Sequence, residues 1–255
     1  MNLRFFIKFT KAEWAEDIKS QGKFYFNPAY KFFTSPHYSL GQYDPWDSHV
    51  NINAKYLVYA PIIEENERGI KYGPGKKLAD EARIHLLDNR NKNIPICCFR
   101  MVNDSEIKDD IFKIDSQLYV KICDDFPEYD SFALIWIDAF FDILSKSQWG
   151  NMVYGHWVYY DDTSEFDDFY QGSGEEGFED KYPYLKMFNK ERQYEYQQEF
   201  RLILPAEHWV EGKCIEIGSL NDIVLVGKIK QLNAGFRIKK RIDNDIYYCE
   251  FEELL

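Results

Sequence analysis

The segment Tyr194-Glu195-Tyr196-Gln197-Gln198-Glu199-Phe200-Arg201-Leu202-Ile203-Leu204 has the alternating pattern of a β-strand. Successive side chains of a strand point to opposite faces, so an apolar set here alternates with a polar one. The apolar set is Phe200, Leu202 and Leu204, and the polar set is Gln197, Glu199 and Arg201. Proline cannot continue a hydrogen-bonded ladder, and Pro205 is expected to end the strand. We therefore predict a strand with one apolar and one polar face.

The polar face of this strand presents an amide, a carboxylate and a guanidinium group. At a rise of roughly 3.3 Å per residue, each lies about 7 Å from the next. That spacing suits a ligand-binding surface with Glu199 as a catalytic carboxylate. The simpler alternative is a solvated strand face on which Glu199 and Arg201 pair with residues of neighbouring strands. The strand alone leaves both interpretations open.

Length and charge limit the class of protein. The chain has 255 residues, with 31 Lys and Arg against 43 Asp and Glu, which gives a net charge of −12. We predict a single α+β domain over residues 1–255, with an antiparallel-rich sheet and few helices. Direct nucleic-acid binding is not expected, because phosphates would repel an acidic surface. A basic protein partner fits the charge better. The many aromatic side chains are also compatible with a homo-oligomeric interface.

The cysteines and the apolar runs bear on compartment and metal binding. The five cysteines are irregularly spaced, without the paired pattern of a zinc site, so no metal is predicted. The longest apolar run, near residues 132–144, is broken by Asp138 and Asp142. It is therefore not expected to span a bilayer. No signal peptide is recognised at the N-terminus, and a reducing cytoplasm is predicted.

The first 28 residues read as strand, helix and strand. Residues 3–9 form the first strand and Thr10 is a predicted N-cap, with Glu13 as its capping-box partner. The helix is predicted over 11–20, ended by Gly22, and the second strand over 23–26, ended by Asn27-Pro28. Further along, residues 117–123 read as a strand and residues 129–145 as a helix with a broad apolar face.

Residues 161–181 form the most acidic segment, interspersed with aromatic residues and glycines. One interpretation is a solvated loop. The other is an acidic aromatic arm that docks on a basic partner. Its contact residues would be Asp161, Asp162, Asp167, Asp168, Glu175 and Glu176. The acids lack the spacing of a calcium-binding loop.

No motif of a serine hydrolase, a zinc protease or a dinucleotide-binding fold occurs. The chain does resemble a group of bacterial and phage proteins of undetermined function. The matching pieces are Phe9-Thr10, residues 21–28, residues 30–33, the Asp-Pro-acid loop at 41–47, and residues 196–201. The resemblance covers mainly the first 50 and the last 70 residues.

The same organisation resembles, more distantly, the ADP-ribosyltransferase superfamily. Gln197-x-Glu199 matches the late Gln-x-Glu strand of that family, although the first strand has neither a His-Gly nor an Arg-Gly pair. The resemblance implies a split sheet and NAD as the cofactor. It implies catalytic roles for Glu199, Gln197 and Tyr30, with Glu199 stabilising an oxocarbenium-like transition state. The cofactor contacts it implies are Arg4, Lys8, Thr10, Tyr25, Asn27 and Arg201.

Two functions therefore remain open from the sequence. The first is an NAD-using ADP-ribosyltransferase of phage or bacterial origin, acting as a toxin or in defence. The second is a non-catalytic acidic inhibitor, a nucleic-acid mimic used against host defence. It would occupy a basic site on a partner protein.

Overall fold

The computed structural model describes residues 5–34, 43–45, 47–54, 57–66, 69–80, 82–87, 89–160, 184–243 and 246–253. Arg4 and the acidic segment, with its six predicted partner contacts, lie outside the described residues.

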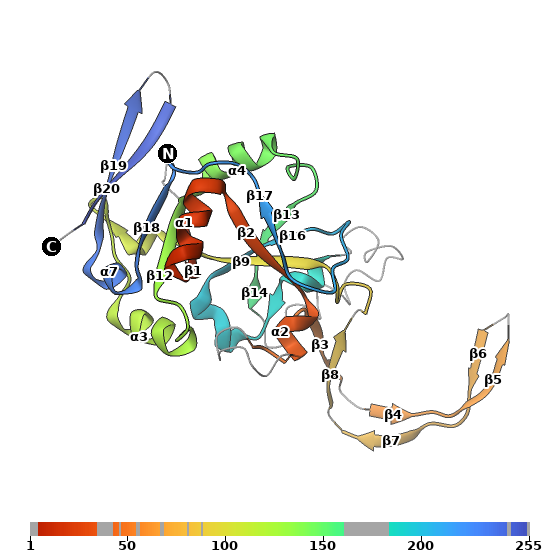
Figure 1. Cartoon of the computed structure of the whole chain (residues 1–255). Helices are drawn as coiled ribbons and strands as arrows, with labels where there is room; N and C mark the ends of the chain where they lie inside the picture. The colour runs from red at the N-terminus through yellow and green to blue at the C-terminus, as the bar shows by residue number, and fades with distance from the viewer. Residues whose placement is uncertain are drawn as a thin grey trace.

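An antiparallel sheet forms the centre of an α+β fold (Figure 1). Its main path runs β13 (Tyr154–Trp157), β16 (Glu199–Ile203), β9 (Pro95–Met101), β1 (Phe5–Thr10), β12 (Ser131–Trp136) and β18 (Val224–Lys228). Off this path, β2 (Lys23–Pro28) pairs with β17 (Lys213–Glu216) and, at its end, with β9. The predicted α+β class with an antiparallel-rich sheet is confirmed.

Helices cover both faces of this sheet. They are α1 (Ala12–Gln21), α2 (Tyr30–Thr34), α3 (Ser116–Asp125), α4 (Ile137–Lys146) and α7 (Ile229–Ala234). Short 3-10 turns occur at Asp104–Glu106 (η1), Leu185–Phe188 (η2) and Arg192–Gln197 (η3). Phe6 contacts Phe140 of α4, whereas Phe9, which points to the other face of β1, stacks on Phe126 just after α3.

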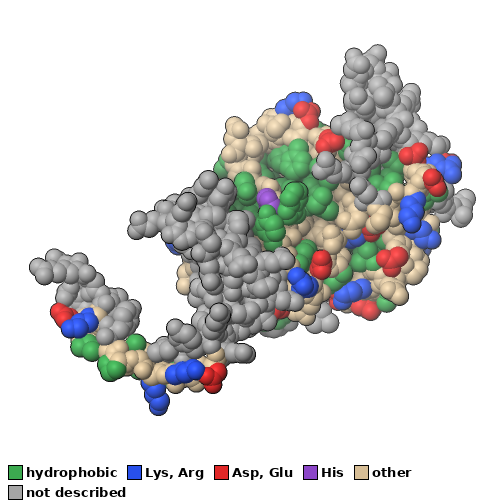
Figure 2. Space-filling model, turned by 180° about the vertical axis from the view of Figure 1, so that it is seen from behind, with side chains coloured by type: hydrophobic (Ala, Val, Ile, Leu, Met, Phe, Trp, Pro, Cys, Tyr) green, Lys and Arg blue, Asp and Glu red, His purple; other side chains and the backbone are tan. Residues whose placement is uncertain are grey.

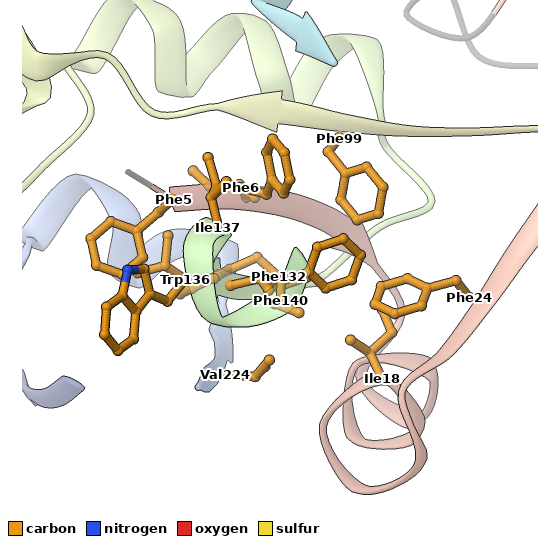
Figure 3. Close-up of a cluster of buried hydrophobic side chains, with 14 of the residues drawn as sticks. Phe5, Phe6, Ile18, Phe24, Phe99, Phe132, Trp136, Ile137, Phe140 and Val224 are labelled. Carbon is orange, nitrogen blue, oxygen red and sulfur yellow. The ribbon is translucent and has the colours of Figure 1, made fainter. Parts of the chain in front are cut away.

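Aromatic side chains dominate the core between the sheet and α4 (Figure 3). The ring of Phe6 lies 5.2 Å from Phe99 and 4.8 Å from Phe200, and Phe24 meets Phe140 edge to face at 5.6 Å. Each of these rings is nearly or fully buried. Burial of one such side chain stabilises the fold by about 1.5–3 kcal/mol. This cluster fixes β1, β2, β9 and β16 relative to one another.

Two smaller sheets flank the central one. The hairpin of β19 (Phe236–Asp243) and β20 (Ile246–Glu253) is extended by β11 (Ile111–Phe112) and β10 (Ile107–Lys108). A short parallel pair joins β14 (Tyr159–Tyr160) to β15 (Asn189–Lys190), which brings Lys190 toward the central sheet.

Three successive two-stranded ribbons extend from the body (Figure 1). They pair β3 (His49–Ala54) with β8 (Ala82–Leu87), β4 (Leu57–Tyr59) with β7 (Lys76–Ala79), and β5 (Ile62–Asn66) with β6 (Gly69–Tyr72). We call residues 57–80 the arm. The β3–β8 ribbon joins it to the body.

Two predicted elements change type in the structure. The helix expected over 129–145 is divided into strand β12 and helix α4, because residues 131–136 form a strand buried on both faces. Such a strand is uniformly apolar and lacks the alternation that marks an exposed one. The strand expected over 117–123 is helix α3, whose first turn is capped by the carboxylate of Asp115.

Two predictions near the N-terminus and in the late strand are also corrected. Thr10 is not an N-cap but the last residue of β1, where it pairs with Ser131. Gly22 does end the helix, in the left-handed conformation. The late strand begins only at Glu199, because Gln198 adopts a left-handed conformation with φ of 44° and the preceding residues form η3.

Candidate functional site

The central sheet splits between β1 and β9. These two strands pair only at Phe6–Met101 and Ile7–Arg100. Beyond that point β1 continues to Thr10 against β12, while β9 follows β16 and the end of β2. The split leaves an opening within the sheet, between the tip of β1 and the middle of β9.

A cavity of about 660 Å³ lies at this split. That volume falls in the range of small-molecule and cofactor sites. Its wall includes six of the nine residues for which the resemblance implies catalytic or cofactor roles, namely Lys8, Thr10, Tyr25, Asn27, Gln197 and Glu199. Aromatic side chains supply much of the remaining wall, from Phe9, Trp14, Phe24, Phe32, Phe99, Phe126, Tyr129 and Tyr196.

The cavity passes from one face of the sheet to the other. Lys8 shares the face of Phe6 and lies over the ring of Phe99, at 5.4 Å from its centroid. Phe200 also contacts Phe6, so its neighbour Glu199 projects from the opposite face. Since Lys8 and Glu199 nevertheless line the same cavity, the cavity reaches through the split.

Lys8 bonds to the exposed edge of β9 at the split. Its Nζ donates a hydrogen bond of 2.7 Å to the carbonyl oxygen of Cys98. Among the described residues no carboxylate forms an ion pair with this ammonium group. An ammonium has three donors, so Lys8 retains capacity to bind an anionic group in the cavity.

A buried cluster of charges lies on the other side of the split, centred on Glu199. Arg201 Nε donates to Glu199 Oε1 at 2.6 Å, and Lys190 Nζ donates to Glu199 Oε2 at 3.1 Å. Arg201 also donates two bonds to Asp47, at 2.8 and 2.6 Å, and one of 2.6 Å to the carbonyl of Met187. The alternative of a solvated strand face is therefore wrong about solvation, since Arg201 is only 1% exposed, but right that Glu199 pairs with a residue of another strand, Lys190 of β15.

The charges in this cluster stabilise one another. Burial opposes ionisation of Glu199, but the positive charges of Arg201 and Lys190 outweigh it and hold the pKa of this carboxyl far below its ordinary value. Burial likewise opposes the charge of Lys190, yet Glu199 and Asp47 raise its pKa above the ordinary value. Glu199 is therefore a permanent anion at neutral pH and a poor proton acceptor.

Gln197 belongs to the same cluster although it is not on the strand. It ends η3, where its side-chain oxygen accepts a bond of 2.8 Å from Lys190 Nζ. Its side-chain nitrogen donates to the Tyr196 hydroxyl at 3.0 Å, and that hydroxyl donates to Asp125 of α3. The left-handed Gln198 thus lets Gln197 and Glu199 face the same lysine.

Comparison of the chain with models of protein families, with curated proteins and with solved structures gave no match.

Some predicted site residues lie elsewhere. Tyr30 does not line the cavity, and its hydroxyl donates to the carbonyl of Val210, so its predicted catalytic role is not supported. Arg201 does not line the cavity, but its Nε donates a hydrogen bond to Glu199, which does. Lys190 and Asp47 are site residues that were not predicted from the sequence. Only the Asp-Pro-acid loop, which ends at Asp47, carried a signal.

In the part of the chain that the structure describes, no three His, Cys, Asp or Glu side chains come together as metal ligands. No helix among those residues is long and apolar enough to cross a membrane.

The charge cluster predicts how stability depends on pH. Because the pKa of Glu199 is lowered from 4.5, its contribution is present above about pH 4.5 and is lost as the pH falls through the folded-state value. This loss has a limiting slope of about 1.4 kcal/mol per pH unit. The raised pKa of Lys190 gives a contribution present below pH 10.5 and lost as the pH rises through the folded-state value.

Urea denaturation between pH 3 and 9 measures this dependence. The wild type should lose more stability below pH 4.5 than the Glu199→Gln variant, which lacks the titrating group. Equal acid sensitivity of the two proteins would contradict the assignment.

Proposed function

We propose that the protein is an ADP-ribosyltransferase-like enzyme that binds NAD in the cavity at the split of the sheet. One observation carries the proposal. Lys8, Tyr25 and Asn27, from the opening strands, line the same cavity as Gln197 and Glu199, which lie between 170 and 191 residues later in the chain. The resemblance to ADP-ribosyltransferases implies that grouping.

The state of Glu199 suits the chemistry. Cleavage of the bond between nicotinamide and ribose leaves positive charge on the ribose ring. A carboxylate that is ionised at all working pH values can stabilise that charge and accept a hydrogen bond from a ribose hydroxyl. Each oxygen of Glu199 receives one bond from a basic side chain, which leaves further acceptor capacity toward the cavity. We assign Glu199 this electrostatic role, with Lys190 and Arg201 as the residues that position it.

The rest of the wall offers contacts for the other parts of NAD. The ammonium of Lys8, which has no carboxylate partner among the described residues, suits the diphosphate, because a cation on an apolar wall attracts anions strongly. Trp14 and Tyr25 line the cavity and are each 47% exposed, so their rings are accessible for stacking on a base. A ligand as long as NAD would pass through the split, with its diphosphate near Lys8 and one ribose near Glu199.

Calorimetry with NAD tests the proposal. We expect the wild type to bind NAD, and Lys8→Met to weaken binding at least tenfold, because the variant keeps the apolar stem and loses the charge. Lys108→Met, which removes an exposed lysine away from the cavity, is the matched control and should bind like the wild type. Circular dichroism of each variant checks that the fold is retained.

The opposite result would favour the second function. No binding at millimolar NAD would contradict the enzyme, and a pull-down with the intact protein would then test the acidic inhibitor. That alternative rests on the net charge of −12 and on the segment 161–181.

We also propose a reducing compartment such as the cytoplasm, since Cys97, Cys98, Cys123 and Cys214 are free thiols.

A further inference from the structure

The arm exposes large apolar side chains along a ribbon that stands away from the body (Figures 1 and 2). Four of them are more than half exposed, namely Tyr59, Ile62, Ile63 and Leu78. An isolated two-stranded ribbon is at best marginally stable in water. An arm built in this way is expected to gain stability by packing on another surface.

The charge of the arm limits what that surface can be. Residues 57–80 contain four Lys or Arg and four Asp or Glu, so the arm is neutral and the remaining chain carries the whole net charge of −12. A basic protein or a nucleic acid would have no electrostatic preference for the arm. The partner surface should therefore be apolar, and acidic residues around it would not repel the neutral arm.

The body of the same protein has such a surface at β13. This strand is the last one on its side of the central sheet, so among the described residues its outer edge has no partner strand. Tyr154 and Trp157 on it are 46% and 52% exposed. Figure 2 also shows hydrophobic side chains gathered on the body, on the face seen from behind.

We propose that the partner is a second copy of this chain, and that the two copies exchange arms. The arm of each copy lies along β13 of the other, adding a ribbon to the open edge of the central sheet. Open strand edges are templates for such addition, and the half-exposed aromatic side chains of β13 would meet Ile63 and Leu78. Two identical contacts related by a twofold axis close the dimer and leave no open site for further growth. This inference does not depend on the proposed enzyme activity.

Sedimentation equilibrium of the full-length protein tests the exchange. We expect a mass of about twice 30.5 kDa at concentrations of tens of micromolar. Ile63→Lys, on the arm, and Trp157→Lys, on β13, should each weaken the dimer at least tenfold. Val210→Lys alters a side chain that is 69% exposed and outside both surfaces, and should leave the dimer unchanged.

Mixing the two weakened variants distinguishes arm exchange from arm-to-arm contact. A mixed dimer of Ile63→Lys and Trp157→Lys chains contains one contact with both changes and one contact that is entirely wild type. Either substitution alone is expected to disrupt its contact, so a contact with both changes loses little more than a contact with one. The mixture keeps one intact contact and should therefore dimerise more tightly than either variant alone. A monomeric wild type at 200 μM, a dimer insensitive to both substitutions, or a mixture with no recovery would each overturn the proposal.

Discussion

Replacement of Arg201 by methionine is expected to lower the free energy of unfolding by about 3–5 kcal/mol, the usual cost of removing one partner from a buried ion pair. The guanidinium group is the shared counter-ion of Asp47 and Glu199, and both carboxylates are almost completely buried. Without it, Lys190 would be the one basic group among the described residues that pairs with Asp47 and Glu199. Urea denaturation at pH 7 measures the loss.

The chain offers a matched control for this prediction. Arg237 pairs with Glu252 on the surface, with both side chains about half exposed. Arg237→Met should cost less than about 1 kcal/mol, because water already solvates both charges. In the double variant Arg201→Met/Asp47→Asn one orphaned charge is removed, so its loss should be smaller than the sum of the two single losses. A loss below about 1 kcal/mol for Arg201→Met would contradict the role of the cluster.

Under the proposed function, Glu199→Gln is expected to slow the release of nicotinamide from NAD by about a thousandfold or more, equivalent to about 4 kcal/mol of transition-state stabilisation. The amide keeps the size of the side chain but cannot balance a positive ribose. Binding of NAD itself should change much less, so the effect should appear in kcat rather than in KM. A fluorescent or chromatographic assay of nicotinamide gives the rate.

Stability must be followed in the same variant. Glu199→Gln leaves Lys190 and Arg201 with one fewer buried anion, so the protein should also unfold at lower urea concentration. Rates are therefore compared at a temperature where circular dichroism shows the variant to be folded. Glu195→Gln, an exposed glutamate in η3, is the control and should keep the wild-type rate. A rate for Glu199→Gln within tenfold of the wild type would rule out the proposed role.

Residues that end a helix, such as glycine, were sufficient to predict where that helix stops. Helix α1 ends in a left-handed residue, a conformation that glycine adopts easily. The end of the helix was therefore predictable from Gly22 alone. The central strand β12 was not predictable in this way, because a strand buried on both faces shows neither strand alternation nor a reliable helical period. The tertiary burial of residues 131–136 decided their structure.

The candidate site shows the same division. Lys8, Tyr25, Asn27, Gln197 and Glu199 were chosen from two short segments, and the fold brings them to one cavity. The partners that fix the charge of Glu199 were not predictable, because they come from distant parts of the chain. Asp47 is 154 residues from Arg201, and only the folded protein shows that they pair.

The order of strands in the central sheet has a consequence for biosynthesis. β1 precedes the other strands of the central sheet, yet its neighbours β9 and β12 lie some 90 and 125 residues later, and β16 and β18 come later still. Pairings of such long sequence separation form slowly and only after the later strand exists. Asp47 in particular leaves the ribosome long before Arg201 is available to neutralise it. A nascent chain that has not yet reached β16 therefore contains no assembled carboxylate site, and the cell that makes this protein meets the proposed activity only once Glu199 and Arg201 have been synthesised.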